Sequence, residues 1–224
     1  MSVHLQNDLE KLKQSILDIG ILVEDTVEKS MKAFRKREVD LAKEVIADDE
    51  IINQREVEIE EECLKLLALY QPVAEDLRFI TSVVKMNNDL ERMGDCSVKI
   101  AKRTLSLSKE PPIEIPLDIE VMIKEVKSMV KDCLDAFFNK DTTFAREICV
   151  RDDRVDALHR KVIKDLRSRM HESPNEIDQL LDLITAAQGL ERIADLATNI
   201  AQDVVYMVEG DIIRHQEDQY PRKS

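Results

Sequence analysis

This 224-residue chain has little glycine, proline or aromatic residue: it contains 4 Gly, 6 Pro, 4% aromatics and no Trp. So few helix breakers, combined with 43% hydrophobic and 35% charged residues, are typical of long helices around an aliphatic core. The apolar fraction and its periodicity exclude a disordered chain. Its length suits one large domain or two domains of roughly 100 residues each.

Closely spaced cysteines are also missing. Cys63, Cys96, Cys133 and Cys149 form no CxxC pair, which argues against a zinc site. All four fall in predicted helices, where free buried thiols are expected. The N-terminus has neither the basic nor the apolar region of a secretory signal, and no run approaches the 18 apolar residues that suggest a membrane span. We therefore predict a cytoplasmic protein with reduced thiols.

The chain has fewer positive than negative side chains: it contains 33 Lys and Arg and 46 Asp and Glu, which gives a formal net charge of -13. Nucleic-acid binding requires Lys and Arg to neutralise phosphates, so this balance argues against a nucleic-acid partner. It also argues against an anionic membrane surface. An acidic surface instead fits cations or a basic protein partner.

Heptad spacing is the main signal for secondary structure. The apolar residues from Leu5 to Val23 are spaced alternately by four and three residues, which predicts one long amphipathic helix. Similar patterns and the breaks between them predict further helices. The predicted ranges are 5–36, 41–70, 72–107, 117–139, 142–171 and 174–209.

Several residues mark the expected helix ends. Asp40 is a candidate N-cap for the second helix, and Pro72 is placed in the first turn of the third. Residues 173–176 read Ser-Pro-Asn-Glu, a capping-box sequence with proline at the first helical position. Gly210 is a candidate C-terminal residue for the last helix, and the polar tail from Asp211 is expected to fray.

The chain repeats itself. Residues 109–116 hold three of the six prolines, which places a boundary between residues 1–110 and residues 111–224. Features of the first part recur 100 to 103 residues later: Ala33-Phe34 with Ala136-Phe137, Pro72 with Pro174, and Glu91 with Glu191. We predict an all-α protein of two tandem antiparallel three-helix bundles, related by internal duplication.

The most specific repeat is acidic. Residues 89–95 read Asp-Leu-Glu-Arg-Met-Gly-Asp and residues 189–195 read Gly-Leu-Glu-Arg-Ile-Ala-Asp. The pairs Glu91/Asp95 and Glu191/Asp195 stack on one helix face, where like charges cost a few tenths of a kcal/mol. Acid pairs are common on solvated helices. The same pair at equivalent positions of both repeats, however, indicates that something offsets the repulsion, and a bound hard cation is the simplest explanation.

The second helix of each repeat carries a matching oxygen pair. Asp49-x-x-x-Asn53 lies 23 residues before Pro72, and Glu91 lies 19 residues after it. At a rise of 1.5 Å per residue, the distances of Asp49 and Glu91 from the turn at Pro72 differ by only about 6 Å along the helix axis. The two oxygen pairs are therefore expected to face each other in an antiparallel bundle. Asp152-x-x-x-Asp156 repeats the arrangement.

Two further features bear on this predicted site. Asn199 adds an oxygen four residues after Asp195, whereas Lys99 stands at its counterpart, so the two sites need not be equal. Gly94 and Ala194 are small enough to admit a ligand or another helix, although tight helix packing explains small residues equally well. The predicted metal ligands are Asp49, Asn53, Glu91, Asp95, Asp152, Asp156, Glu191, Asp195 and Asn199.

Catalytic patterns are missing. A di-iron site of the ferritin type requires two Glu-x-x-His motifs, and the nearest matches are Asp156-Ala-Leu-His159 and Asn53-Gln-Arg-Glu56. Arg92 and Arg192 have acidic neighbours, so salt bridges are expected of them rather than anion binding. No P-loop, nucleophile elbow or Cys-His pair is present, so we predict no enzyme.

These acidic pairs and the duplicated three-helix plan resemble the PhoU family over roughly residues 5–210. The resemblance implies a cytoplasmic negative regulator of phosphate uptake and of the phosphate-starvation response. It implies multinuclear metal clusters in the Glu/Asp-x-x-x-Asp motifs, a homodimer, and two partners: the ATPase subunit of the phosphate ABC transporter and a phosphate-responsive sensor histidine kinase. Ala194 departs from the glycine usual there.

Three function classes follow from this reading. The first is a metal-binding regulatory adaptor, the second a purely structural bundle whose acid pairs are surface decoration, and the third a metal-dependent helical enzyme. Oxygen ligands suit Mg, Ca, Mn or Fe, and zinc completes the range of candidate ions. Metal analysis of protein purified without chelator separates the first class from the second.

Overall fold

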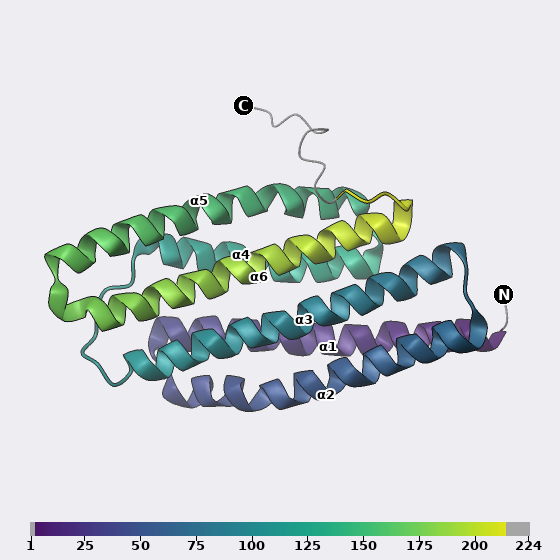
Figure 1. Ribbon diagram of the computed structural model, residues 1–224, viewed down its shortest axis with the longest axis horizontal. Helices are drawn as coiled ribbons and strands as arrows, with labels where there is room; N and C mark the ends of the chain where they lie inside the picture. Colours follow the sequence, from purple (N-terminus) through teal and green to yellow (C-terminus); the bar gives the residue numbers. More distant parts are fainter. Residues whose placement is uncertain (1–2, 214–224) are drawn as a thin grey trace.

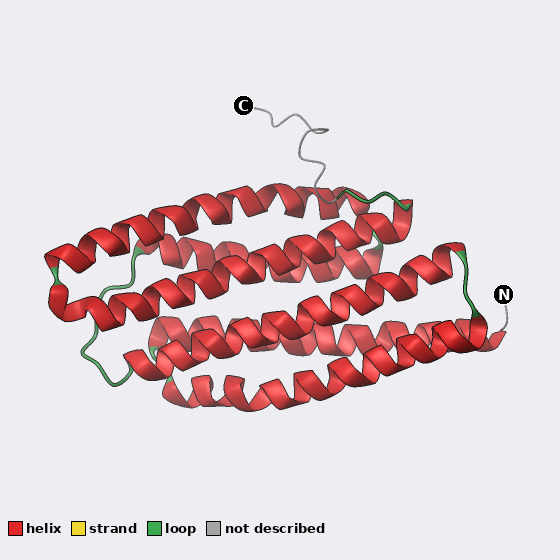
Figure 2. Cartoon of the chain, in the orientation of Figure 1, coloured by secondary structure: helices red, strands yellow, loops and turns green. Residues whose placement is uncertain are grey.

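A computed structural model describes residues 3–213 as six long α-helices and one short 3₁₀ turn. Within this range the chain forms no strand (Figure 2). The elements are α1 Val3–Lys36, α2 Val39–Tyr70, α3 Ala74–Leu107, α4 Leu117–Asn139, α5 Thr142–Glu172, the 3₁₀ turn Pro174–Glu176 and α6 Ile177–Glu209.

The helices form two three-helix bundles lying side by side (Figure 1). Helices α1, α2 and α3 contact one another in the first bundle, and α4, α5 and α6 do so in the second. Successive helices run in opposite directions, while α2 and α5 occupy the two outer edges (Figure 1). The predicted fold class, two tandem antiparallel three-helix bundles, is confirmed.

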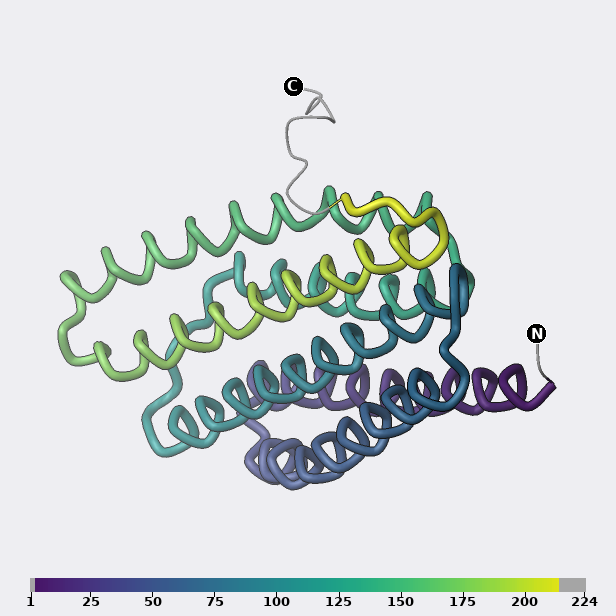
Figure 3. The backbone as a smooth tube through the Cα atoms, turned by 45° about the vertical axis from the view of Figure 1, so that its right-hand side comes forward, coloured from purple at the N-terminus to yellow at the C-terminus, as the bar shows by residue number. Residues whose placement is uncertain are grey.

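The bundles meet where α3 crosses α6 in the opposite direction, and α1 contacts α4 behind this crossing (Figures 1 and 3). Two ion pairs bracket the crossing: Lys85 lies 3.3 Å from Asp203, and Arg103 lies 3.1 Å from Asp182. Because these pairs lie on either side of the repeated acidic motifs, the two motif copies occupy the middle of the crossing.

Both bundles share one core. The seam residues predicted from Leu5 to Phe34 are buried, except that Leu9 is only partly covered. The main cluster of buried apolar side chains draws on all six α-helices. Each fully buried aliphatic side chain contributes roughly 1.5–3 kcal/mol, so this cluster supplies most of the stability. The repeat boundary after residue 110 stays a prediction.

Two predicted helix starts are wrong. Helix α2 begins at Val39, so Asp40 lies in its first turn, where its charge still favours the helix dipole, and Glu38 is the N-cap. Pro72 precedes α3, whose N-cap is Val73. The reason is that Gln71 takes a left-handed conformation to end α2, and the reversal between antiparallel helices uses residues 71–73.

The predicted capping box is right in position, with Ser173 as the N-cap and Pro174 as the first residue of the 3₁₀ turn, but wrong in its bonds. Ser173 makes no side-chain capping bond, and Glu176 instead forms a 2.8 Å salt bridge with Arg169 of the preceding helix. The charge-assisted contact outcompetes the backbone cap, and a 3₁₀ turn starting at Pro174 precedes α6. Gly210 does end α6, with φ +83°. Most of the tail predicted from Asp211, including His215, lies outside the described residues.

None of the helices in residues 3–213 has a stretch long and apolar enough to cross a membrane. The four cysteines are free; Cys63, Cys96 and Cys133 are buried, and Cys149 is half-buried. Burial raises the pKa of Cys63 to about 12, so this thiol stays protonated at neutral pH. The thiols therefore act as small core residues.

Candidate metal sites

Helices α2 and α3 pass closely at the first acidic motif. A Cβ atom on Gly94 would lie 3.2 Å from Ile52 Cδ1 and 3.7 Å from Asp49 Oδ1. Glycine therefore allows the helices to approach until Asp49, on α2, lies against the motif on α3. Tight helix packing, one of the two predicted roles of Gly94, is what the structure shows.

The second half reaches the same packing with a different pair. Ala194 stands at the position of Gly94, and Val155 stands at the position of Ile52. All of these residues except glycine are fully buried hydrophobic side chains. The methyl group gained by alanine is offset by the one lost from isoleucine to valine. The larger residue at position 194 is thus matched by a smaller one at position 155.

Three carboxylates converge in the second half. Asp156 on α5 and Glu191 and Asp195 on α6 each place an oxygen within 4.8 Å of the others. Asp152 adjoins them: burial, then the charges of Asp195 and Asp156, raise its pKa to about 7. Its Oδ1 atom is buried without a hydrogen-bond partner. Three of the four acids predicted for the second site therefore converge across α5 and α6, and Asp152 lies near them without joining the group.

The first half has a looser version. Burial, then the charge of Asp95, raises the pKa of Asp49, while a hydrogen bond with Asn53 opposes this change. Burial and then Asp95 also raise the pKa of Glu91. Asp49 Oδ1 is buried and unpartnered, like its counterpart in Asp152. Among the described residues, the first half has no acidic triplet as tight as that of the second, because Asn53 replaces an acid.

A fifth position in each cluster was compared with a ferritin-type motif in the sequence but was not included among the predicted ligands. Glu56 adds to the negative charge around Glu91, and burial raises its own pKa. His159 occupies the equivalent place beside Asp156 and Asp195. The offset of 103 residues that relates Asn53 to Asp156 also relates Glu56 to His159, so extending that comparison by three residues identifies both.

Asn199, four residues after Asp195 on α6, lies at the boundary with the other bundle. It lines a hollow of about 430 Å³ with residues of the other bundle, including Glu56, Asn88 and Arg92. Its counterpart Lys99 is exposed. Asn199 as a metal ligand stays a prediction. The predicted salt bridge of Arg192 is confirmed, since its guanidinium lies 3.1 Å from Asp195.

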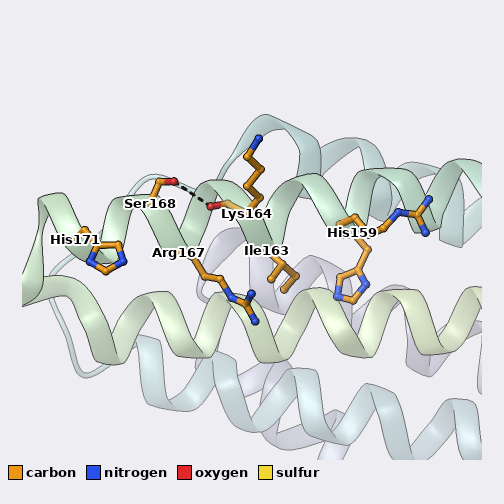
Figure 4. Close-up of a pocket in the computed structure, with 7 residues that line it drawn as sticks. His159, Ile163, Lys164, Arg167, Ser168 and His171 are labelled. Atoms are coloured by element: carbon orange, nitrogen blue, oxygen red, sulfur yellow. Dashed lines mark hydrogen bonds between the residues drawn. The ribbon is translucent and has the colours of Figure 1, made fainter.

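A second hollow runs along α5 from the acidic cluster. It measures about 470 Å³ and extends from His159 past Ile163 and Arg167 to His171 (Figure 4). Arg160 and Lys164 also line it, so its border is basic. The equivalent positions on α2 include Glu60 and Glu61. Glu60 corresponds to Ile163 and Glu61 to Lys164, so the charge is reversed at one of these positions.

The residues present fit a divalent cation. Unpartnered buried oxygens on Asp49 and Asp152 have no ready explanation from packing, and buried polar atoms are normally hydrogen-bonded. Carboxylate and amide oxygens are ligands for hard and borderline ions. A cation would also relieve the mutual repulsion that raises the pKa values of the acids.

Burial of these acids predicts a pH-dependent stability for the metal-free protein. Between about pH 4 and 7 the folded state keeps the Asp152 proton that the unfolded state has released, so raising the pH favours unfolding. With solvent screening of this half-buried group, we expect a loss of about 2 kcal/mol. Urea unfolding of chelator-treated protein at pH 4.5 and pH 8 measures it.

Asp152→Asn should remove most of this dependence, whereas Glu147→Gln, at an exposed position of the same helix, should leave it unchanged. An equal response of the wild type and Asp152→Asn to pH would contradict the prediction. The sign is the opposite of the usual salt-bridged carboxylate, which stabilises a fold above its unfolded pKa.

The fold and its clusters define a class: duplicated all-α proteins with an equivalent acidic cluster in each three-helix repeat. The chain belongs to the PhoU family. The model of the PhoU domain matches residues 16–104 and 119–204, one match in each repeat. The family resemblance inferred from the acidic motifs is confirmed.

Relatives match along nearly the whole chain. A phosphate-specific transport system accessory protein PhoU homolog from Aquifex aeolicus is 39% identical, over 95% of this chain and 96% of its own. The phosphate-specific transport system accessory protein PhoU of Escherichia coli is 31% identical, over 93% and 86%.

Solved structures agree with the fold. The crystal structure of PhoU from Pseudomonas aeruginosa superposes with a TM-score of 0.89 at 37% identity, covering 92% of this chain and 99% of that chain. The phosphate transport system regulatory protein PhoU from Streptococcus pneumoniae gives 0.86 at 32% identity, covering 93% and 98%.

Proposed function

We propose that this protein is a metal-binding adaptor that negatively regulates phosphate uptake and the phosphate-starvation response. The observation that carries the proposal is family membership along most of the chain, with relatives named as accessory and regulatory proteins of phosphate transport. The paired acidic clusters, with buried unpartnered oxygens in both halves, support the metal-binding part.

The adaptor acts by binding rather than by catalysis. A di-iron enzyme of the ferritin type would require a histidine in both repeats. Here His159 occupies that place in one repeat and Glu56 in the other. This difference favours the regulatory adaptor over the metal-dependent enzyme. If the protein were a purely structural bundle, nothing would offset the repulsion between the buried Asp152 and its acidic neighbours.

We place the protein in the cytoplasm as a homodimer, with the ATPase subunit of the phosphate ABC transporter and the phosphate-responsive sensor kinase as its partners. The acidic face of α2, defined by the exposed residues Glu58 and Glu61, suits a basic patch on a partner. Such association should weaken above about 0.15 M salt, where the Debye length is roughly 8 Å.

The bound ions would be multinuclear clusters of Fe, Mn, Zn, Mg or Ca. Each acidic cluster lies between two helices at half-buried positions, so a bound ion could keep a coordination position open toward the surface. A partner carboxylate or carbonyl would then complete the coordination shell. In this way metal occupancy would control partner binding, in addition to the charge of α2.

Deletion of the gene in the native host tests the regulatory role. We expect phosphate-starvation genes to be expressed in high phosphate, because the restraint on the kinase is lost. The wild-type gene should restore repression and co-purify the transporter ATPase and the kinase. Full repression in the deletion strain, with neither partner captured, would refute the regulatory proposal and favour the structural bundle.

Charge variants sharpen this test. Glu58→Lys with Glu61→Lys reverses charge on the acidic face of α2 and should abolish partner capture and repression together. Glu147→Lys with Asp153→Lys makes the same charge change at exposed positions of α5 and should retain both. Equal loss in the two variants would show that net charge, and not this face, matters.

A further inference from the structure

His159 is the unexplained side chain of the second acidic cluster. Its Nε2 atom is buried and has no hydrogen-bond partner. Figure 4 shows the ring projecting from α5 toward the neighbouring helix, at one end of the hollow. The charges of Asp156 and Asp195 both act on it, so the imidazole lies near these two carboxylates, with its ring nitrogens outside the 4.8 Å group that Asp156, Glu191 and Asp195 form.

A buried ring nitrogen without a partner is costly, because it has given up water without gaining a hydrogen bond. Neutral imidazole is the form that ligates metals. A bound ion would offset the cost of burying this nitrogen without a hydrogen bond, as it would for the buried oxygen of Asp152.

The first half differs at this place. Glu56 is the counterpart of His159, and Asn53 is the counterpart of Asp156. The first cluster therefore offers oxygen alone, from three carboxylates of the predicted set, one amide and Glu56. The second cluster offers oxygen from four acids and one imidazole nitrogen.

We infer that His159 is a nitrogen ligand of the second site, and that the two halves therefore select different metal ions. The mixed site favours a borderline first-row ion such as Zn²⁺ or Fe²⁺, because imidazole suits these ions. The all-oxygen site favours Mn²⁺ or Mg²⁺, which carboxylates and carbonyls suit. This inference rests on the proposed metal binding and adds which ion each repeat takes.

Single-site proteins allow each half to be measured in the full chain. Glu91→Gln with Asp95→Asn disables the first site, and Glu191→Gln with Asp195→Asn disables the second. Each protein is stripped with chelator and titrated with Zn²⁺ and Mn²⁺ in competition. We expect the Zn²⁺ preference over Mn²⁺ to be at least about tenfold higher in the protein that retains the second site.

Exchanging the fifth residue should exchange the preference. His159→Glu in the second-site protein should lower its Zn²⁺ preference at least about tenfold, and Glu56→His in the first-site protein should raise it. His171→Glu is the matched control, because this histidine lies on the same helix at the far end of the hollow. It should change nothing.

A spectroscopic readout identifies the ligand directly. Cu²⁺ in the second-site protein should show electron spin-echo modulation from an imidazole nitrogen, which His159→Glu removes and His171→Glu retains. Circular dichroism checks that every variant keeps its helices. Metal bound with the same preference and no nitrogen modulation would overturn the inference while sparing the proposed function. No metal bound by any of these proteins would refute the metal-binding proposal itself.

Discussion

The variant Glu191→Gln with Asp195→Asn should lose its second-site metal while its helices remain intact. These residues supply two of the three converging carboxylates, so we expect the affinity to fall by at least about a hundredfold. The core, and not the ion, holds the bundle together, so the metal-free variant should unfold at equal or higher urea concentration than metal-free wild type. Removing acids from a repulsive cluster favours this direction.

Mass spectrometry measures the loss of metal, and circular dichroism measures whether the helices are retained. The pair Glu91→Ala with Asp95→Ala makes the same test on the first site. Glu147→Gln with Asp153→Asn, on the exposed surface of α5, is the matched control and should bind metal as wild type does. Unchanged metal content in both site variants would defeat the ligand assignment. Loss of helicity on adding chelator would show that the metal is structural, as in a zinc finger.

Gly189→Leu should be the most destabilising single change at the crossing of α3 and α6. A Cβ atom at this position would lie 2.9 Å from Ile100 Cγ1 and 3.7 Å from the backbone oxygen of Cys96. A larger side chain must displace the neighbouring helix, which costs about 3 kcal/mol in an overpacked core. Urea unfolding measures the loss.

The exposed neighbour on the same helix makes the control, because Gln188→Leu adds a similar side chain where space is free. It should change the free energy of unfolding by less than about 0.5 kcal/mol. Similar stability of the two variants would mean that α3 and α6 pack less closely at Gly189 than the structure describes. Because the acidic motifs lie at this same crossing, we also expect Gly189→Leu to weaken metal binding.

The helix ends show which features follow from the local sequence and which depend on contacts between helices. Gly210 ends α6 as predicted, because a left-handed C-terminal residue is a local preference of glycine. The bonds of the capping box at Ser173 do not form because Arg169, one turn back on another helix, competes for Glu176. Pro72 failed because the reversal between helices required three residues before α3 began.

The candidate sites likewise combine features that the sequence predicts with features that depend on how the helices pack. Facing oxygen pairs were predicted from helix rise and the position of Pro72, and the structure brings Asp156, Glu191 and Asp195 together. Glu56 and His159 were set aside because they do not form two Glu-x-x-His motifs, and their side chains become parts of a cluster only when α2 meets α3 and α5 meets α6. The position of Asn199 beside residues of the other bundle depends on the crossing of α3 and α6.

By itself, the sequence determined the helices, the duplication, the family and the pairs of acids, because these follow from periodicity and from repeats along one chain. Only the tertiary structure decided which acids converge, which oxygens are buried without partners, and that His159 adjoins one cluster while Glu56 adjoins the other. The physical reason is that burial and repulsion between carboxylates depend on the distance between helices. That distance is set by packing at positions such as Gly94 and Ile52, where side chains from separate helices meet.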